Sequence, residues 1–354
     1  MKKSADYKKL IEKFGAKLFN QQLKKKLGKT HKLMELGFIF AHRDFDKYLE
    51  MYKRGGRVAI VSGRGPSNYL HLGHLLLFEF IKYLQELLEA EVYIPLSDDE
   101  KYFFRKVRNL EEAYKYAIDN ALDIISIGYD PEKTHLYVST KTGWVYPLSV
   151  ELSRHLTFST VRATFGFTDE TNPGAIFYGA VQAAHILGPT ILKGYPVTVP
   201  IGIDQDTYMR LTRDIAGKIR VFKPASLYIR FLRGLTGEPM SASNPETCIF
   251  TVDDSETVKR KIWEAFTGGR ATVKEQKLKG GEPDKCVIFE WLSAYYYEDL
   301  KEILEHREKC IGGGIICGEC KRMLSEKIVE ILVEHRRRRE KYRDLLSKYF
   351  EHEI

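Results

Sequence analysis

Two short stretches of the sequence combine residue types that could bind a nucleoside triphosphate. His71–His74 (HLGH) stands where a helix is predicted to begin, and Met240–Ser243 (MSAS) follows a loop rich in glycine and proline. Helix N-termini attract phosphate, and two histidines within one turn can donate hydrogen bonds to its oxygens. Gly73 would let a flat adenine lie against the backbone, and the serines can surround a triphosphate. This pair of motifs predicts ATP binding.

The elements that must position these motifs predict an α/β fold. Three short apolar runs read as buried strands, at residues 58–61, 92–97 and 197–203. Residues 71–88 follow the first strand and a glycine turn, and they have the apolar periodicity of a helix. Strand, turn, helix and strand in this order are typical of a doubly wound parallel sheet. Ligands of such sheets bind at the carboxyl ends of the strands, so we expect the strand ends to face one pocket.

The chain of 354 residues divides into three predicted regions. Residues 1–55 form an N-terminal extension, and the pattern of residues 1–35 predicts an amphipathic helix. Residues 56–243 hold the α/β domain. From residue 244 to residue 354 the pattern is mainly helical and ends in a strongly basic segment.

Charge and composition narrow the cellular setting. The net charge of +8 favours a polyanionic partner, although a generally basic enzyme would look the same. An odd count of five cysteines and no apolar segment near the N-terminus indicate a reducing, cytoplasmic compartment. No uninterrupted apolar run approaches the ~20 residues that a membrane span needs, so we expect no membrane association.

Taken together and in this order, the two motifs resemble the HIGH and KMSKS signatures of class I aminoacyl-tRNA synthetases. The resemblance is closest to the tryptophanyl-tRNA synthetases of the archaeal and eukaryal type, and it covers nearly the whole chain. The further segments that carry it are Phe40–Asp44, Ser62–Pro66, Ser97–Lys101, Phe165–Asp169, Val181–Ala184, Ile203–Asp206 and Arg210–Asp214.

This resemblance implies a two-step reaction and a set of partners. L-Tryptophan and ATP would form tryptophanyl-adenylate, with Mg²⁺ as the counterion, and the aminoacyl group would pass to tRNA(Trp). It implies a Rossmann-like catalytic domain with an insertion at about residues 106–190, through which the family forms homodimers. It also implies that the helical region 244–354 binds the anticodon.

The resemblance assigns site residues as well. Those implied to bind ATP are Arg64, Gly65, His71, Gly73, His74, Met240, Ser241, Ala242 and Ser243. The implied catalytic set is His71, His74, Met240, Ser241 and Ser243. The tryptophan-binding residues are expected to be Glu100, Gln182, His185 and Gln205. A carboxylate with two amide oxygens suits the α-ammonium group of an amino acid. No metal ligand is assigned.

The sequence departs from the family at three positions. Pro239 replaces the first lysine of the second signature, and the cations that could stand in for it are Arg64, Lys223 and Arg233. Val61 and Pro95 replace the tyrosine and glutamine that read the indole N–H in eukaryal relatives. His185 aligns with an indole-reading aspartate of bacterial relatives, so a neutral His185 is the expected acceptor. With an ordinary pKa near ~6.5 it would protonate in mild acid.

Two rival functions remain open. A tyrosyl-tRNA synthetase shares the fold and signatures, but its tyrosine and aspartate that read the phenol correspond to Val61 and His185 here. An inactive tRNA-binding paralogue is supported by the missing lysine alone.

The C-terminal region leaves two further alternatives. Cys310, Cys317 and Cys320, with His306 as a fourth ligand, could bind zinc, but helix-packing cysteines are the favoured interpretation. The run Arg336–Arg339 is either a solvated helix face or a phosphate contact.

Overall fold

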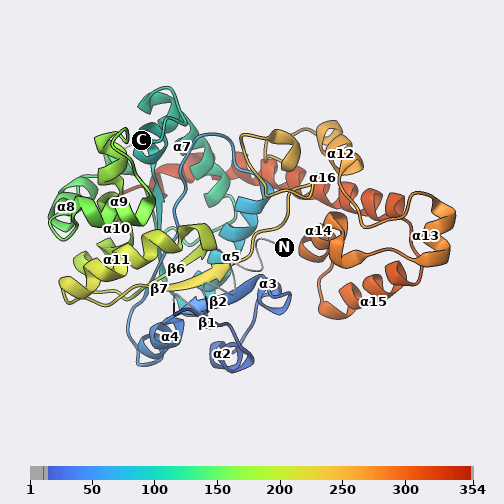
Figure 1. The fold of residues 1–354 in the computed structure, drawn as a ribbon, viewed down its shortest axis with the longest axis horizontal. Coiled ribbons are helices and arrows are strands. Elements are labelled where there is room, and N and C mark those ends of the chain that lie inside the picture. The colour runs from blue at the N-terminus through green and yellow to red at the C-terminus, as the bar shows by residue number, and fades with distance from the viewer. Residues whose placement is uncertain (1–10, 12–14, 352–354) are drawn as a thin grey trace.

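The computed structural model describes residue 11 and residues 15–351, and it has an α/β architecture (Figure 1). One seven-stranded sheet has the order β1-β2-β7-β6-β3-β4-β5. The strands are β1 (Lys17–Leu18), β2 (Ile39–Arg43), β3 (Ala59–Val61), β4 (Glu91–Leu96), β5 (Thr134–Val138), β6 (Val197–Gly202) and β7 (Ala225–Ile229). Strands β7, β6, β3, β4 and β5 are parallel, and β2 joins β7 antiparallel. The predicted fold class and its three strand runs are confirmed.

Helices cover both faces of this sheet. They are α4 (Phe45–Lys53), α5 (Leu72–Leu88), α6 (Asp98–Phe103), α7 (Leu110–Ile125), α8 (Val145–Ser153), α9 (Phe158–Phe165), α10 (Pro173–Lys193) and α11 (Asp206–Lys218). Successive residues of a strand point to opposite faces. Ile60 therefore packs in the larger core with Phe80 of α5, while Val61 packs in a second core with Val181 of α10.

Helix α10 is long and apolar enough to cross a membrane, judged by its length and composition alone. However, 72% of its most apolar window is buried inside the protein. It packs on α8, α11 and the sheet. This burial is what a core helix of the α/β domain shows.

The C-terminal region is helical, as the sequence predicts. It contains α12 (Ser255–Glu264), α13 (Val273–Lys279), α14 (Val287–Tyr295), α15 (Leu300–Ile311) and α16 (Cys317–Tyr342), followed by the 3₁₀ segment η5 (Arg343–Tyr349). Helix α16 has 26 residues and runs from this region back to the α/β domain (Figure 1). There the Glu351 amide donates to the Leu136 carbonyl of β5 at 3.0 Å.

The amphipathic helix predicted over residues 1–35 is wrong for residues 15–35. Residues 15–35 form β1 and two short helices, α2 (Gln21–Leu27) and α3 (Lys32–Glu35). The Asn20 side chain caps α2 by accepting from the Leu23 amide at 3.0 Å. Gly28 ends the helix with a φ of 88°, a conformation that glycine adopts without strain. Residues 1–10 and 12–14 lie outside the described part.

The stretch predicted as a dimerising insertion contains α7 to α10 and also β5, which extends the parallel sheet. Two aromatic residues of this stretch, Phe165 and Trp144, pack within the chain. The ring of Phe165 lies 5.4 Å from that of Phe167 and 4.5 Å from that of Tyr208. Trp144 packs on Tyr137 at 5.1 Å between ring centroids.

Candidate active site

The first signature begins helix α5 at the carboxyl end of the sheet. His71 is the N-cap residue, and the rings of His71 and His74 stack with centroids 3.6 Å apart. Burial lowers the pKa of His71 to about 3 and, together with the nearby Arg64 charge, also lowers that of His74. Both imidazoles are therefore neutral at pH 7. Each then carries one N–H, which suits donation to a phosphate oxygen.

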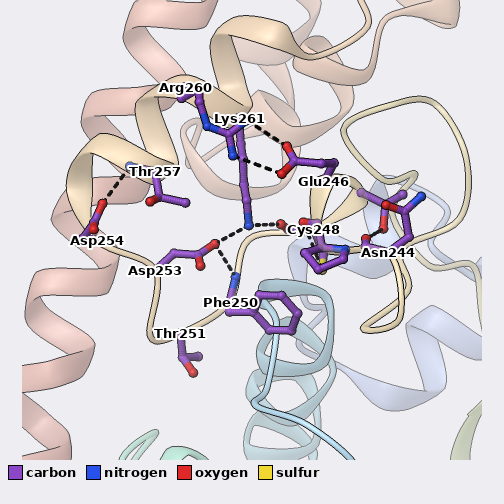
Figure 2. Close-up of polar contacts among 12 residues, drawn as sticks. Asn244, Glu246, Cys248, Phe250, Thr251, Asp253, Asp254, Thr257, Arg260 and Lys261 are labelled. Carbon is purple, nitrogen blue, oxygen red and sulfur yellow. Dashed lines mark hydrogen bonds and ion pairs between the residues drawn. The ribbon is translucent and has the colours of Figure 1, made fainter.

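The segment after the second signature holds this helix start in place. Phe250 bridges His71 antiparallel, and the Leu72 amide donates to the Ile249 carbonyl at 2.9 Å. Figure 2 shows how the same segment is anchored: the Lys261 ammonium donates to the Cys248 carbonyl at 3.0 Å and to Asp253 at 2.7 Å. Lys261 is buried, so this ion pair fixes the segment firmly.

The two signatures touch each other. A Cβ built on Gly73 would lie 2.6 Å from Met240 Cε, so the methionine side chain rests directly against this glycine. The Ser241 and Ser243 hydroxyls are 2.8 Å apart, and the Ser241 amide donates to Thr247 Oγ1 at 3.0 Å. Met240 therefore brings the MSAS loop against the HLGH turn.

Arg64 lies in the glycine turn directly after β3. Its Nε donates to Asn120 Oδ1 at 3.3 Å, while its Nη2 is buried without a hydrogen-bond partner among the described residues. Burial lowers its pKa to about 10, so the guanidinium stays charged at pH 7. A buried cation with an unused donor favours an anionic ligand. Asn120 is a site residue that sequence reasoning missed, because no motif marks it.

Glu100 faces the same turn. A Cβ on Gly65 would lie 2.2 Å from Glu100 Oε2, and Glu100 pairs with Lys101 at 3.0 Å. On α10 the Tyr178 hydroxyl donates to Gln182 Oε1 at 2.8 Å. Burial and the Glu100 charge both raise the pKa of Tyr178. Glu100 and Gln182 thus both lie near Tyr178. The only signal for Tyr178 in the sequence is that it stands one helical turn before Gln182.

Gln205 follows β6, and its Nε2 donates to Asp204 at 2.9 Å. It lies at the carboxyl edge of the sheet, as do the turn after β3 and the acidic helix α6 after β4. Asp99 of α6 is buried beside Asp98, and burial first, then that neighbouring charge, raises its pKa to about 7. Acidic and amide groups therefore gather at this edge.

His185 lies on α10 and is almost fully buried, with 1% of its surface exposed. Its Nε2 is 3.1 Å from Ser139 Oγ, and its ring centroid is 5.6 Å from that of Tyr137. Burial lowers its pKa to about 3, so protonation in mild acid, expected from the sequence, is wrong. Its Nδ1 is buried with no hydrogen-bond partner among the described residues. Tyr137 belongs to the same apolar core as Val61, the position that replaces an indole-reading tyrosine.

The three cations proposed to replace the signature lysine have different surroundings. Arg233 is occupied, because it donates to Glu290 and to the Lys285 and Cys286 carbonyls. Lys223 precedes β7, so it stands at the amino edge of the sheet, opposite the site. Arg64 alone of the three lies at the carboxyl edge with an unused donor.

The arginine run on α16 is split between two environments. Arg336 donates to the Asp253 carbonyl, and Arg339 pairs with Asp119 at 2.7 Å and also with Asp123. The side chains of Arg337 and Arg338 are 84% and 51% exposed, and both pair with Glu334 on the same helix. Two of the four arginines therefore join α16 to other elements.

Comparisons with known proteins agree with this geometry. The family described as tRNA synthetases class I (W and Y) matches residues 53–333. The chain is 46% identical to a tryptophan–tRNA ligase of Pyrobaculum arsenaticum, over 97% of this chain and 94% of that protein. A crystal structure of a tryptophanyl-tRNA synthetase from Aeropyrum pernix K1 has a TM-score of 0.92 and 35% identity, covering 99% and 98% of the two chains. One from Plasmodium falciparum has a TM-score of 0.89 and 35% identity, covering 98% and 97%.

The fold and the paired signatures place this chain in class I of the tRNA synthetases. It belongs to the family of that class that serves tryptophan and tyrosine, and within it to the tryptophanyl-tRNA synthetases of the archaeal and eukaryal type.

Proposed function

We propose that this chain is a tryptophan–tRNA ligase that uses its joined signatures to activate L-tryptophan with ATP. The observation that carries the proposal is the contact of Met240 with Gly73, which brings both ATP-binding motifs together beside the buried Arg64. The full-length identity to tryptophan–tRNA ligases supports tryptophan as the amino acid.

In the first step the tryptophan carboxylate attacks the α-phosphorus, and pyrophosphate leaves. The neutral His71 and His74 would donate N–H groups to the phosphates, and the amides and hydroxyls of residues 240–243 would hold the departing pyrophosphate. Catalysis of this kind is mainly positioning and charge stabilisation. The two motifs contain no lysine or arginine, so Mg²⁺ bound with ATP fits the charge that remains. In the second step a ribose hydroxyl of tRNA(Trp) accepts the aminoacyl group.

We assign to Arg64 the role of the signature lysine that Pro239 replaces. Its position after β3, its charge and its unused Nη2 support this role over Arg233 and Lys223. Arg64→Lys keeps a charge but loses the planar fork, and Arg64→Gln loses the charge. We expect exchange activity to fall in the order wild type, Lys, Gln. Equal activity of wild type and Arg64→Gln would contradict the assignment.

The amino-acid site would be made of Glu100, Gln182, Gln205 and His185. The first three suit the α-ammonium group, because they offer one carboxylate and two amide oxygens. His185 is proposed to accept the indole N–H through Nδ1, and its burial in the core that contains Tyr137 supports this.

ATP–pyrophosphate exchange with each amino acid in turn tests the function. We expect exchange with tryptophan and poor exchange with tyrosine. Sites that would leave a polar group unpaired often reject the wrong substrate by factors of ~10⁴. Equal exchange with tyrosine would establish the tyrosyl alternative. No exchange with any amino acid, by a chain that still binds tRNA, would establish the inactive paralogue.

Assembly and location are also proposed. A homodimer is supported by exposed apolar side chains on two helices of the stretch 106–190: Val150 of α8 and Phe158 of α9 are 62% and 51% exposed. Light scattering at micromolar concentration should report twice the chain mass, and a monomer would contradict this. Five free thiols fit a reducing cytoplasm. The helical region 244–354 is proposed to bind the anticodon.

A further inference from the structure

Four of the five cysteines line one small cavity in the helical region. The cavity has a volume of about 20 Å³, enough for one water-sized occupant. Its thiols come from Cys286, Cys310, Cys317 and Cys320, while Cys248 lies apart from them, after the second signature. All five are free thiols.

Three helices bring these thiols together. Cys286 is the N-cap residue of α14, Cys310 lies in the last turn of α15, and Cys317 and Cys320 lie in the first turn of α16. The sequence alone suggested only the last three, with His306 as a fourth ligand. The structure adds Cys286, which stands far ahead of the others in the chain, and so supplies four sulfur atoms.

The backbone comes close to the sulfur atoms of two of the cysteines, and glycine occupies each approach. A Cβ on Gly269 would lie 2.4 Å from Cys317 Sγ, and one on Gly281 would lie 2.8 Å from Cys310 Sγ. Any larger residue at these two positions would displace a thiol, so the chain is shaped around them.

Hydrogen-bond donors point at the sulfur atoms. The Phe289 amide donates to Cys286 Sγ at 3.5 Å. His306 Nδ1 lies 2.5 Å from the Tyr297 hydroxyl. If that hydroxyl donates, His306 Nε2 carries the proton and donates to Cys320 Sγ at 3.4 Å. Donors to sulfur are the usual outer contacts of metal-bound thiolates.

A donor on the cavity wall is also unused. Gln276 lines the same cavity, and its buried Nε2 has no hydrogen-bond partner among the described residues. Its Oε1 is already engaged with the Arg270 amide at 3.1 Å. An unpaired buried N–H costs about 1–3 kcal/mol, and a thiolate in the cavity would satisfy it.

The local electrostatics suit thiolates that are paired with a cation. Cys320 is buried beside the other three cysteines, so four thiolates there would need a compensating cation. The positive end of the 26-residue helix α16 lies at Cys317, and Lys321 is one turn further on. A metal would supply the charge that allows all four thiols to ionise.

We propose that Cys286, Cys310, Cys317 and Cys320 bind a metal centre through four thiolates, as either Zn²⁺ or an iron–sulfur cluster. Each thiol releases its proton to solvent and forms one metal–sulfur bond. Among the described residues, no group of three or more His, Cys, Asp or Glu side chains is already arranged to hold a metal ion. Binding therefore requires the thiols to rotate inward or to be bridged by a larger centre. This inference stands independently of the proposed function.

Metal analysis of the full-length chain, purified without oxygen from cells grown with both zinc and iron, tests the site. We expect about one zinc per chain, or iron with a matching amount of acid-labile sulfide and visible absorption. Cys286→Ser and Cys317→Ser should each lose most of the metal. Cys248→Ser is the matched control and should keep it.

Several results would overturn the site. One is that the wild-type chain contains neither metal and all of its thiols react with a thiol reagent. Another is that Cys248→Ser loses as much metal as Cys286→Ser and Cys317→Ser. If the serine variants are insoluble, the wild type alone decides. After chelation it should take up Co²⁺ with the intense sulfur-to-cobalt absorption of a thiolate site, and a chain that shows no such absorption and regains neither metal refutes the proposal.

Discussion

A buried carboxylate on α7 joins α16 to the HLGH turn. Asp123 is fully buried, with 0% of its surface exposed. Its Oδ1 accepts from His335 Nε2 at 2.7 Å and from Arg339 of α16, and its Oδ2 accepts from Thr251 Oγ1 at 2.8 Å. The Thr251 amide in turn donates to the Leu70 carbonyl at 2.9 Å, directly before the first signature.

We expect Asp123→Asn to destabilise the chain and to weaken ATP binding. The amide keeps the shape but removes the charge, so two charge-assisted hydrogen bonds worth about 1.5–3 kcal/mol each are weakened. Arg339 keeps its ion pair with Asp119 at 2.7 Å, which limits the loss. The free energy of unfolding should therefore fall by about 3 kcal/mol, within the range for a broken buried pair.

The kinetic consequence should be selective. Because Thr251 holds Leu70, the KM for ATP should rise more than the KM for tryptophan. The matched control is Asp119→Asn, which removes the partly exposed carboxylate from the same arginine and leaves Thr251 in place. We expect about 1 kcal/mol or less from the control.

Urea unfolding followed by circular dichroism gives the stability change, and exchange kinetics give both KM values. If Asp123→Asn and Asp119→Asn lower the free energy of unfolding equally, the buried network around Asp123 contributes no more stability than the partly exposed ion pair. An unchanged KM for ATP in a destabilised Asp123→Asn enzyme would show that the network does not reach the signature turn.

Three further predictions concern other parts of the molecule. His185→Ala should raise the KM for tryptophan by about 1–3 kcal/mol of lost binding, but not that for an analogue with sulfur in place of the indole N–H. Ser139→Ala is the control, because it removes only the contact of His185 Nε2 and leaves Nδ1 in place. If His185→Ala affects tryptophan and the sulfur analogue equally, His185 is not the acceptor of the indole N–H. Replacing the exposed Arg337 and Arg338 with glutamine should make the slope of log K for tRNA binding against log salt concentration shallower by ~1–2. Adenylate formation should be unaffected. An unchanged slope would mean that these two arginines only face solvent. Acid should destabilise the fold, because the pKa values of His71 and His185, about 3 when folded, lie below the unfolded value. The unfolded chain binds more protons between pH 6.5 and 3, so urea titrations should show each histidine removing about 2 kcal/mol at pH 5, and a flat profile would contradict their burial.

The strands and the signature helix could be predicted from the sequence, because local periodicity determines them, whereas only the family resemblance implied that the two motifs share one site. The start of α5 after the glycine turn is an example: residues 71–88 were expected, and the helix is Leu72–Leu88. The N-terminal region failed for a local reason. Asn20 and Gly28 set helix boundaries there that the apolar spacing did not reveal.

Long-range contacts explain the other differences. The pKa of His185 depends on the burial of its side chain beside Ser139 and Tyr137, which no sequence pattern expresses. The inward turn of Arg339 depends on Asp119 and Asp123, far away in the chain. Cys286 joined the other cysteines for the same reason, because three helices have to meet before its thiol has neighbours.

The return of the chain to β5 has a consequence for the order of synthesis. Strand β5 is the edge of the sheet, and residues 349–351 bond to it and to the loop before it: Tyr349 donates to the Tyr129 carbonyl, 220 residues earlier. At ~5–20 residues per second, a ribosome needs roughly 10–45 s to make the intervening chain. During that interval the β5 edge on a nascent chain has no partner, and an unpaired edge is a template for aggregation. Variants that weaken η5 should therefore lower the soluble yield of newly made protein more than they lower the stability of the finished molecule.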